Sequence, residues 1–90
     1  MRSVWYHRTF KKNFRKRIAP NPKLVEQFEA RLVLFTHGEH GYPLYDHPLT
    51  GNHIGRRSFS ITGDIRIIYE EVDDGAAVLI DIGTHAQVYG

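Results

Sequence analysis

The stretch from His53 to Ile82, HIGRRSFSITGDIRIIYEEVDDGAAVLIDI, reads as three consecutive β-strands. β-Branched and aromatic residues fill three segments, at roughly 53–61, 64–72 and 76–82. Thr62-Gly63 separates the first two segments and Asp73-Asp74-Gly75 the last two, and both sequences are typical of hairpin turns. The stretch therefore predicts a mainly antiparallel β-meander.

Two helices and a short strand are predicted ahead of the meander. Apolar residues recur every four positions from Phe10 to Ile18, the period of an amphipathic helix, which must end before Pro20. Asn21-Pro22 is a typical helix start and Gly38 a typical helix end. Residues 3–6 suit a strand. We therefore expect an α+β fold with an N-terminal strand, a helical hairpin and the meander.

Composition limits the classes of protein that the chain can belong to. Its 90 residues, 41% of them hydrophobic, suit one small domain, so we expect a single domain over residues 1–90. The absence of cysteine excludes disulfides, thiolate metal sites and a thiol nucleophile. No apolar run approaches the ~18 residues of a membrane span, so we expect a cytoplasmic protein with no membrane partner.

Positive charge is concentrated at one end of the chain. The net charge is only +2, yet residues 1–23 contain eight Lys or Arg residues and no Asp or Glu. Such a surface attracts phosphates at long range in a salt-dependent manner. An ordinary solvated helix face is the alternative. The candidate RNA- or ribosome-binding residues are Arg8, Lys11, Lys12, Arg15, Lys16 and Arg17.

Two further segments suggest acid/base chemistry. Residues 38–55 are rich in Gly, Pro, His and Asn, and such long loops in small domains are usually functional. The segment from Asp46 to Arg57, DHPLTGNHIGRR, and the later Gly83-Thr84-His85 place imidazoles and guanidiniums around the sheet. Histidine titrates at about pH 6.5 and guanidinium binds phosphate bidentately, so the combination suits proton transfer beside a phosphate.

The histidines also allow a metal site as an alternative. His37 and His40 have a ligand-like spacing, and His47 or His53 could complete a set. Against this, no cysteine or acidic residue is placed to help, and a glycine-rich loop would lose much conformational entropy on ordering. We therefore favour acid/base chemistry and expect neither a metal nor a cofactor.

These motifs resemble one family over essentially the whole chain. The order of elements and the motifs at 47–51, 55–59, 64–69, 83–85 and 88–90 are similar to those of the RelE superfamily of bacterial toxins, specifically its YafQ branch. The resemblance implies a RelE-like fold and an endoribonuclease, or mRNA interferase, that cleaves messenger RNA in the ribosomal A site. It also implies a cognate antitoxin that holds the toxin inactive in a hetero-oligomer.

The resemblance also implies roles for particular residues. His47 and His85 match the family positions for proton transfer, Asp64 matches a carboxylate of the site, and Tyr89 matches an aromatic position that contacts substrate. Cleavage without a metal requires the ribose 2′-hydroxyl to lose a proton as it attacks the phosphate, and the leaving 5′-oxygen to gain one. The two histidines suit these tasks.

The chain departs from the YafQ pattern at three positions. Ser60 stands where the pattern has a histidine, Ile65 where it has a tryptophan, and Asp81 where it has a phosphate-binding arginine. A carboxylate at position 81 would repel a phosphate, so another guanidinium must replace the arginine. We favour Arg66, which a neighbouring strand carries. The full set of candidate substrate-binding residues is Arg66, Arg56, Arg57, Tyr89 and Ser60.

Each candidate also has a structural alternative. These are a loop anchor for His47, a cap of the C-terminal turn for His85, a turn former for Asp64, a core position for Tyr89 and an ion pair with Asp81 for Arg57. Two other functions remain open as well: a same-fold inhibitor such as the ParE toxins, which act on DNA gyrase, and a degenerate relative that only binds antitoxin. In each case an acidic antitoxin segment would cover the basic helix and the sheet.

Overall fold

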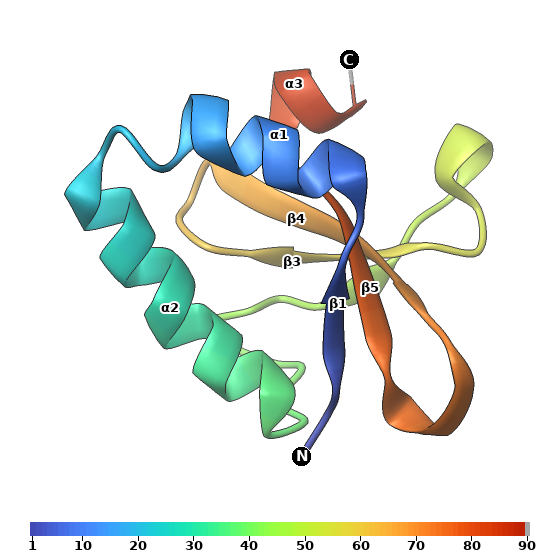
Figure 1. Ribbon diagram of the computed structural model, residues 1–90. Coiled ribbons are helices and arrows are strands. Elements are labelled where there is room, and N and C mark those ends of the chain that lie inside the picture. The colour runs from blue at the N-terminus through green and yellow to red at the C-terminus, as the bar shows by residue number, and fades with distance from the viewer. Residues whose placement is uncertain (90) are drawn as a thin grey trace.

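The computed structural model describes residues 1–89, apart from the side chain of Asp74, and these residues form a mixed five-stranded sheet with helices packed on it (Figure 1). The strand order is β1-β5-β4-β3-β2, in which β1 is parallel to β5 and every other neighbouring pair is antiparallel. The α+β class and the meander are confirmed. The strands are β1 (Val4–Tyr6), β2 (His47–Pro48), β3 (Arg57–Ser60), β4 (Ile65–Glu71) and β5 (Ala77–Thr84).

The two predicted helices are present, as α1 (Arg8–Arg17) and α2 (Pro22–Thr36). The imidazole of His7 accepts a hydrogen bond from the backbone of Thr9 and so caps α1. The side chain of Asn21 caps α2 in the same way, and Gly38, at φ 89°, follows its end. Among residues 1–89 no helix is long and apolar enough to cross a membrane.

The first strand of the meander is shorter than predicted. It begins at Arg57 rather than at His53, because Gly51–His53 form a 3-10 turn and Gly55 has a φ of 90° that ends any extended run. The last strand continues through Thr84, two residues beyond the predicted end. A further short element, α3 (His85–Tyr89), is absent from the prediction.

The start of α3 is encoded in the sequence by a capping box. The hydroxyl of Thr84 accepts from the backbone of Gln87 at 3.2 Å, and the side chain of Gln87 accepts from the backbone of Thr84 at 2.8 Å. This reciprocal pattern is the one expected of Thr-x-x-Gln at a helix N-terminus. It places His85 at the first position of α3, and Gly90, the last residue of the matched motif, lies outside the described residues.

The core lies between the sheet and helices α1 and α2 (Figure 1). Phe35 of α2 stacks on Phe59 of β3 with ring centroids 4.3 Å apart and meets Tyr69 of β4 edge-on at 4.8 Å. A bulge between β4 and β5 shifts their register, so that Leu79 and Ile82, three residues apart, are both fully buried in this core. The sheet is thereby fixed against α2, and the loop that follows α2 lies beside β3.

Candidate functional site

A cleft of about 670 Å³ brings together several of the predicted site residues. Its walls come from the loop between α2 and β3, from the β3–β4 turn and from α3, with one residue each from α2, β3 and β4. A volume of this order suits a ligand of nucleotide size. The lining residues are Arg31, Tyr42, Pro43, Tyr45, His47, Leu49, Thr50, His53, Ser60, Thr62, Gly63, Arg66, His85 and Tyr89.

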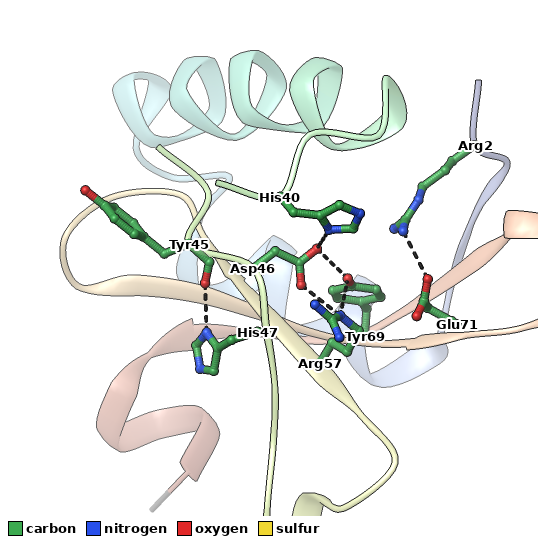
Figure 2. Close-up of polar contacts among 8 residues, drawn as sticks. All are labelled: Arg2, His40, Tyr45, Asp46, His47, Arg57, Tyr69 and Glu71. Atoms are coloured by element: carbon green, nitrogen blue, oxygen red, sulfur yellow. Dashed lines mark hydrogen bonds and ion pairs between the residues drawn. The ribbon is translucent and has the colours of Figure 1, made fainter. Parts of the chain in front are cut away.

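His47 lies in the cleft with its ring oriented by the backbone (Figure 2). Its Nδ1 atom is 2.7 Å from the carbonyl oxygen of Tyr45. A carbonyl only accepts, so Nδ1 carries the proton and, in the neutral ring, Nε2 carries the lone pair. The predicted loop-anchoring bond is therefore real, and it leaves His47 in the tautomer that accepts a proton at Nε2.

Three aromatic rings lie in a row on the α3 side of the cleft. The ring centroid of Tyr89 is 4.6 Å from that of His85 and 5.7 Å from that of His53. The Tyr89 hydroxyl and the His53 Nδ1 atom are buried and have no hydrogen-bond partner among the residues that the structure describes. His85 itself is exposed, at the first turn of α3. The row provides one exposed imidazole and one aromatic surface for a ligand.

Arg66 supplies a guanidinium to the cleft from β4. It lies opposite Ser60 in the β3–β4 register, and its Nη1 donates to the Ser60 hydroxyl at 2.8 Å. The serine that departs from the YafQ pattern therefore holds this arginine in place. Arg31 of α2 also lines the cleft, donating at 3.2 Å to the carbonyl of Pro43.

Three of the predicted catalytic and substrate-binding residues do not line the cleft. Asp64 lies on the β3–β4 turn, where its backbone nitrogen donates to the Thr62 hydroxyl, as in its turn-forming alternative. Arg56 pairs with Glu70 at 3.4 Å. Arg57 belongs to a buried cluster on the other side of the loop.

That cluster is centred on Asp46, whose side chain is fully buried (Figure 2). The carboxylate accepts from Arg57 Nε at 3.0 Å, from the Tyr69 hydroxyl at 2.6 Å and from His40 Nδ1 at 2.7 Å. Burial and then the Asp46 carboxylate raise the pKa of Tyr69 well above its usual range. Burial lowers the pKa of Arg57, but the hydrogen bonds and charge interactions of Arg57 with Tyr69 and Asp46 outweigh burial, and the pKa of Arg57 is raised.

Asp81 does not line the cleft and does not pair with Arg57, so the predicted Arg57–Asp81 ion pair is wrong. The Asp81 carboxylate faces α1, where it accepts from Asn13 Nδ2 at 2.7 Å and lies 3.6 Å from Arg17 Nη1. The register shift between β4 and β5 is the physical reason, because the bulge changes which residues of β5 share a face. The carboxylate is thus neutralised away from the cleft.

The basic residues of α1 divide into two groups. Arg17 is half-buried and donates to the carbonyl of Ile82 at 2.9 Å, so its guanidinium serves the fold. The other predicted nucleic-acid-binding residues form an exposed basic face on α1, which consists of Arg8, Lys11, Lys12, Arg15 and Lys16.

Two residues of the cleft were not predicted as site residues of a nuclease. Arg31 lies on α2, half-buried, and the path of the following loop brings it to the cleft. His53 was a candidate only in the alternative metal site, yet its ring centroid lies 5.7 Å from that of Tyr89. Among the side chains that the structure describes, no group of three His, Asp or Glu residues is arranged to hold a metal ion.

Comparisons with known proteins point to one family. A family model described as "Bacterial toxin of type II toxin-antitoxin system, YafQ" matches residues 2–90. The structure resembles YafQ from E. coli BL21(DE3), with 22% sequence identity, 100% of both chains covered and a TM-score of 0.80. It also resembles the E. coli DinJ-YafQ complex, with 23% sequence identity, 100% of both chains covered and a TM-score of 0.79. A YoeB/ParE toxin from Agrobacterium tumefaciens matches at 17% over 92% of this chain and 98% of that chain, with a TM-score of 0.77. No curated protein matches the chain.

Proposed function

The chain belongs to the YafQ family of bacterial toxins of type II toxin–antitoxin systems, and from this premise we propose that it is a ribosome-dependent endoribonuclease that cleaves messenger RNA. One observation carries the proposal: His47, His85 and Arg66 line a single cleft. Two imidazoles and a guanidinium are the groups that RNA cleavage by proton transfer requires. The site of action is the cytoplasm, where ribosomes translate.

The reaction begins with His47. Its Nε2 takes the proton of a ribose 2′-hydroxyl, whose oxygen attacks the adjacent phosphorus and forms a 2′,3′-cyclic phosphate. The bond from phosphorus to the 5′-oxygen breaks, and protonated His85 gives that oxygen its proton. The hydrogen bond from Nδ1 to Tyr45 supports this role for His47, because it keeps the lone pair on Nε2.

Arg66 and Tyr89 bind the substrate in this scheme. The Arg66 guanidinium, held by Ser60, stabilises the negative charge that develops on the non-bridging phosphate oxygens. Tyr89 offers its ring to a base. Asp64, Arg56 and Arg57 receive no part in bond making, because the first lies outside the cleft lining and the two arginines are paired with carboxylates.

A cognate antitoxin is the proposed regulatory partner, and DinJ in the E. coli DinJ-YafQ complex is the precedent. The exposed basic face of α1 suits an acidic partner. Beside it lies an apolar hollow between α1 and α2, where an antitoxin side chain would be buried. This hollow is lined by Tyr6, Phe10, Lys11, Phe14, Arg15, Ala19 and Phe28.

The test is induction of the wild-type chain and of His85→Ala in cells, with primer extension on cellular messenger RNA. The proposal expects cuts with wild type only, on translated message only, while His85→Ala still binds the antitoxin. His37→Ala is the matched control, because His37 bonds to Val33 outside the cleft, and it should cut like wild type. Arrest of replication without cuts would indicate a gyrase inhibitor, and harmless expression a degenerate relative.

A further inference from the structure

We propose that Asp46 is a positioning residue, which holds the loop so that the Tyr45 carbonyl fixes the tautomer of His47. The inference rests on the proposed function for its catalytic consequence, but its structural claim can be tested separately. Asp46 itself does not line the cleft. Its side chain points toward Arg57 and Tyr69 and away from the ring of His47 (Figure 2).

The backbone of Tyr45 has an unusual conformation. Its φ is +50°, in the left-handed region that residues with a side chain rarely adopt. Such a conformation persists only where the flanking structure imposes it. In this case the conformation has a direct result, because the Tyr45 carbonyl lies 2.7 Å from His47 Nδ1.

Two buried anchors flank Tyr45. Leu44 is fully buried, and its carbonyl accepts from the backbone of Ser60 at 2.7 Å. On the other side, the Asp46 backbone donates to the carbonyl of His40 at 2.8 Å, while the Asp46 carboxylate accepts from Arg57, Tyr69 and His40. Tyr45 is therefore held between a core residue and a carboxylate tied to both β3 and β4.

Of the two anchors, the Asp46 carboxylate is the one that sets the direction of the chain at His47. Leu44 is held by burial and by backbone hydrogen bonds to Gly41 and Ser60, before Tyr45 in the chain, whereas the hydrogen bonds to the Asp46 carboxylate fix the chain after Tyr45, directly before His47. Three donors from separate parts of the chain converge on this carboxylate. Loss of the carboxylate should let Tyr45 relax toward ordinary φ values and turn its carbonyl away from His47.

Histidine nitrogen NMR tests this directly, because the two tautomers give different ring ¹⁵N shifts. In wild type, neutral His47 should carry its proton on Nδ1, and in Asp46→Asn it should show a mixture of both tautomers. Glu70→Gln is the matched control, because this carboxylate on β4 pairs with Arg56 and has no hydrogen bond to Tyr45, Asp46 or His47. His40→Ala is a second variant for the event that Asp46→Asn does not fold, since the His40 side chain is 49% exposed.

Kinetics on translated message supply the second measurement. Asp46→Asn should lower the cleavage rate constant by about tenfold to a hundredfold while substrate binding stays unchanged, because only the orientation of His47 is lost. Folded Asp46→Asn and His40→Ala that keep the wild-type tautomer would overturn the proposal. A wild type that cleaves no RNA would overturn the nuclease function and leave the tautomer comparison to decide the positioning role.

Discussion

Removing the Ser60 hydroxyl should weaken RNA cleavage only through Arg66. The hydroxyl accepts from Arg66 Nη1 at 2.8 Å, and the serine is 8% exposed. A hydrogen bond to a charged donor contributes about 1.5–3 kcal/mol, which corresponds to a factor of about 10 to 100 in rate if the orientation of Arg66 is lost. Arg66→Ala itself should cost about 10²–10³, the effect of losing one donor to a developing oxyanion.

A double-mutant cycle measures the coupling between the two side chains. Single-turnover cleavage of a translated message is compared for wild type, Ser60→Ala, Arg66→Ala and the double variant. The double variant should be no slower than Arg66→Ala, because Ser60 has nothing left to position. Additive losses would refute the reasoning, since Ser60 would then act on the substrate by itself, and an unimpaired Arg66→Ala would remove the arginine from the site.

Ser58 provides the matched control for this cycle. It lies two residues earlier on β3, and its buried hydroxyl has no hydrogen-bond partner among residues 1–89. Ser58→Ala should leave cleavage unchanged, and should leave the free energy of unfolding unchanged or slightly higher, because an unsatisfied buried hydroxyl is removed. Comparing Ser58→Ala with Ser60→Ala thus distinguishes the loss of the hydrogen bond to Arg66 from a general effect of a Ser-to-Ala substitution on the sheet.

Three further predictions concern stability and charge. The folded protein keeps the Tyr69 proton above pH ~10, where an unfolded tyrosine loses it. The free energy of unfolding of wild type should therefore fall by up to about 1.4 kcal/mol per pH unit above pH ~10. Urea unfolding between pH 8 and about 11 should show this slope for wild type and not for Tyr69→Phe. Phe35→Ala should cost about 3–5 kcal/mol in the same assay, because the ring is fully buried and stacked on Phe59. Lys12→Gln should weaken ribosome binding and reduce its salt dependence without changing the thermal midpoint, whereas Arg17→Gln should lower the midpoint.

Local patterns in the sequence predicted most of the fold. The four-residue period from Phe10, the Asn21-Pro22 start and the two hairpin turns are short-range signals, and the helices and strands that they predict are present. The start of β3 was misplaced because His53 and Ile54 have an extended-strand composition, while the positive φ of Gly55 is set by the loop. Parallel pairing of β1 with β5 is a contact between the two ends of the chain, which no local pattern specifies.

The candidate site was less predictable because it depends on which face each side chain occupies. The resemblance to the YafQ family implied His47 and His85 as candidates, and both line the cleft. Residue alternation along the strand suggested an ion pair of Arg57 with Asp81 as a structural alternative, but a one-residue bulge in β5 separates them, and the sequence period cannot reveal a bulge. Arg31 reaches the cleft only because the following loop turns back across α2.

The carboxylate of Asp81 on β5 is compatible with phosphate chemistry in the cleft, because α1 supplies a positive charge that neutralises it. Arg17 reaches both Asp81 and the carbonyl of Ile82, and its Nη1 would lie only 2.7 Å from a Cβ added at Gly83. The same Cβ would lie 2.7 Å from the side-chain oxygen of Gln87, which caps α3. A larger residue at position 83 would therefore disturb both the neutralisation of Asp81 and the helix start that carries His85. The basic helix thus has two separate tasks: its exposed face is available to a nucleic acid or an antitoxin, and its buried end supports the strand and turn that present a proposed catalytic histidine.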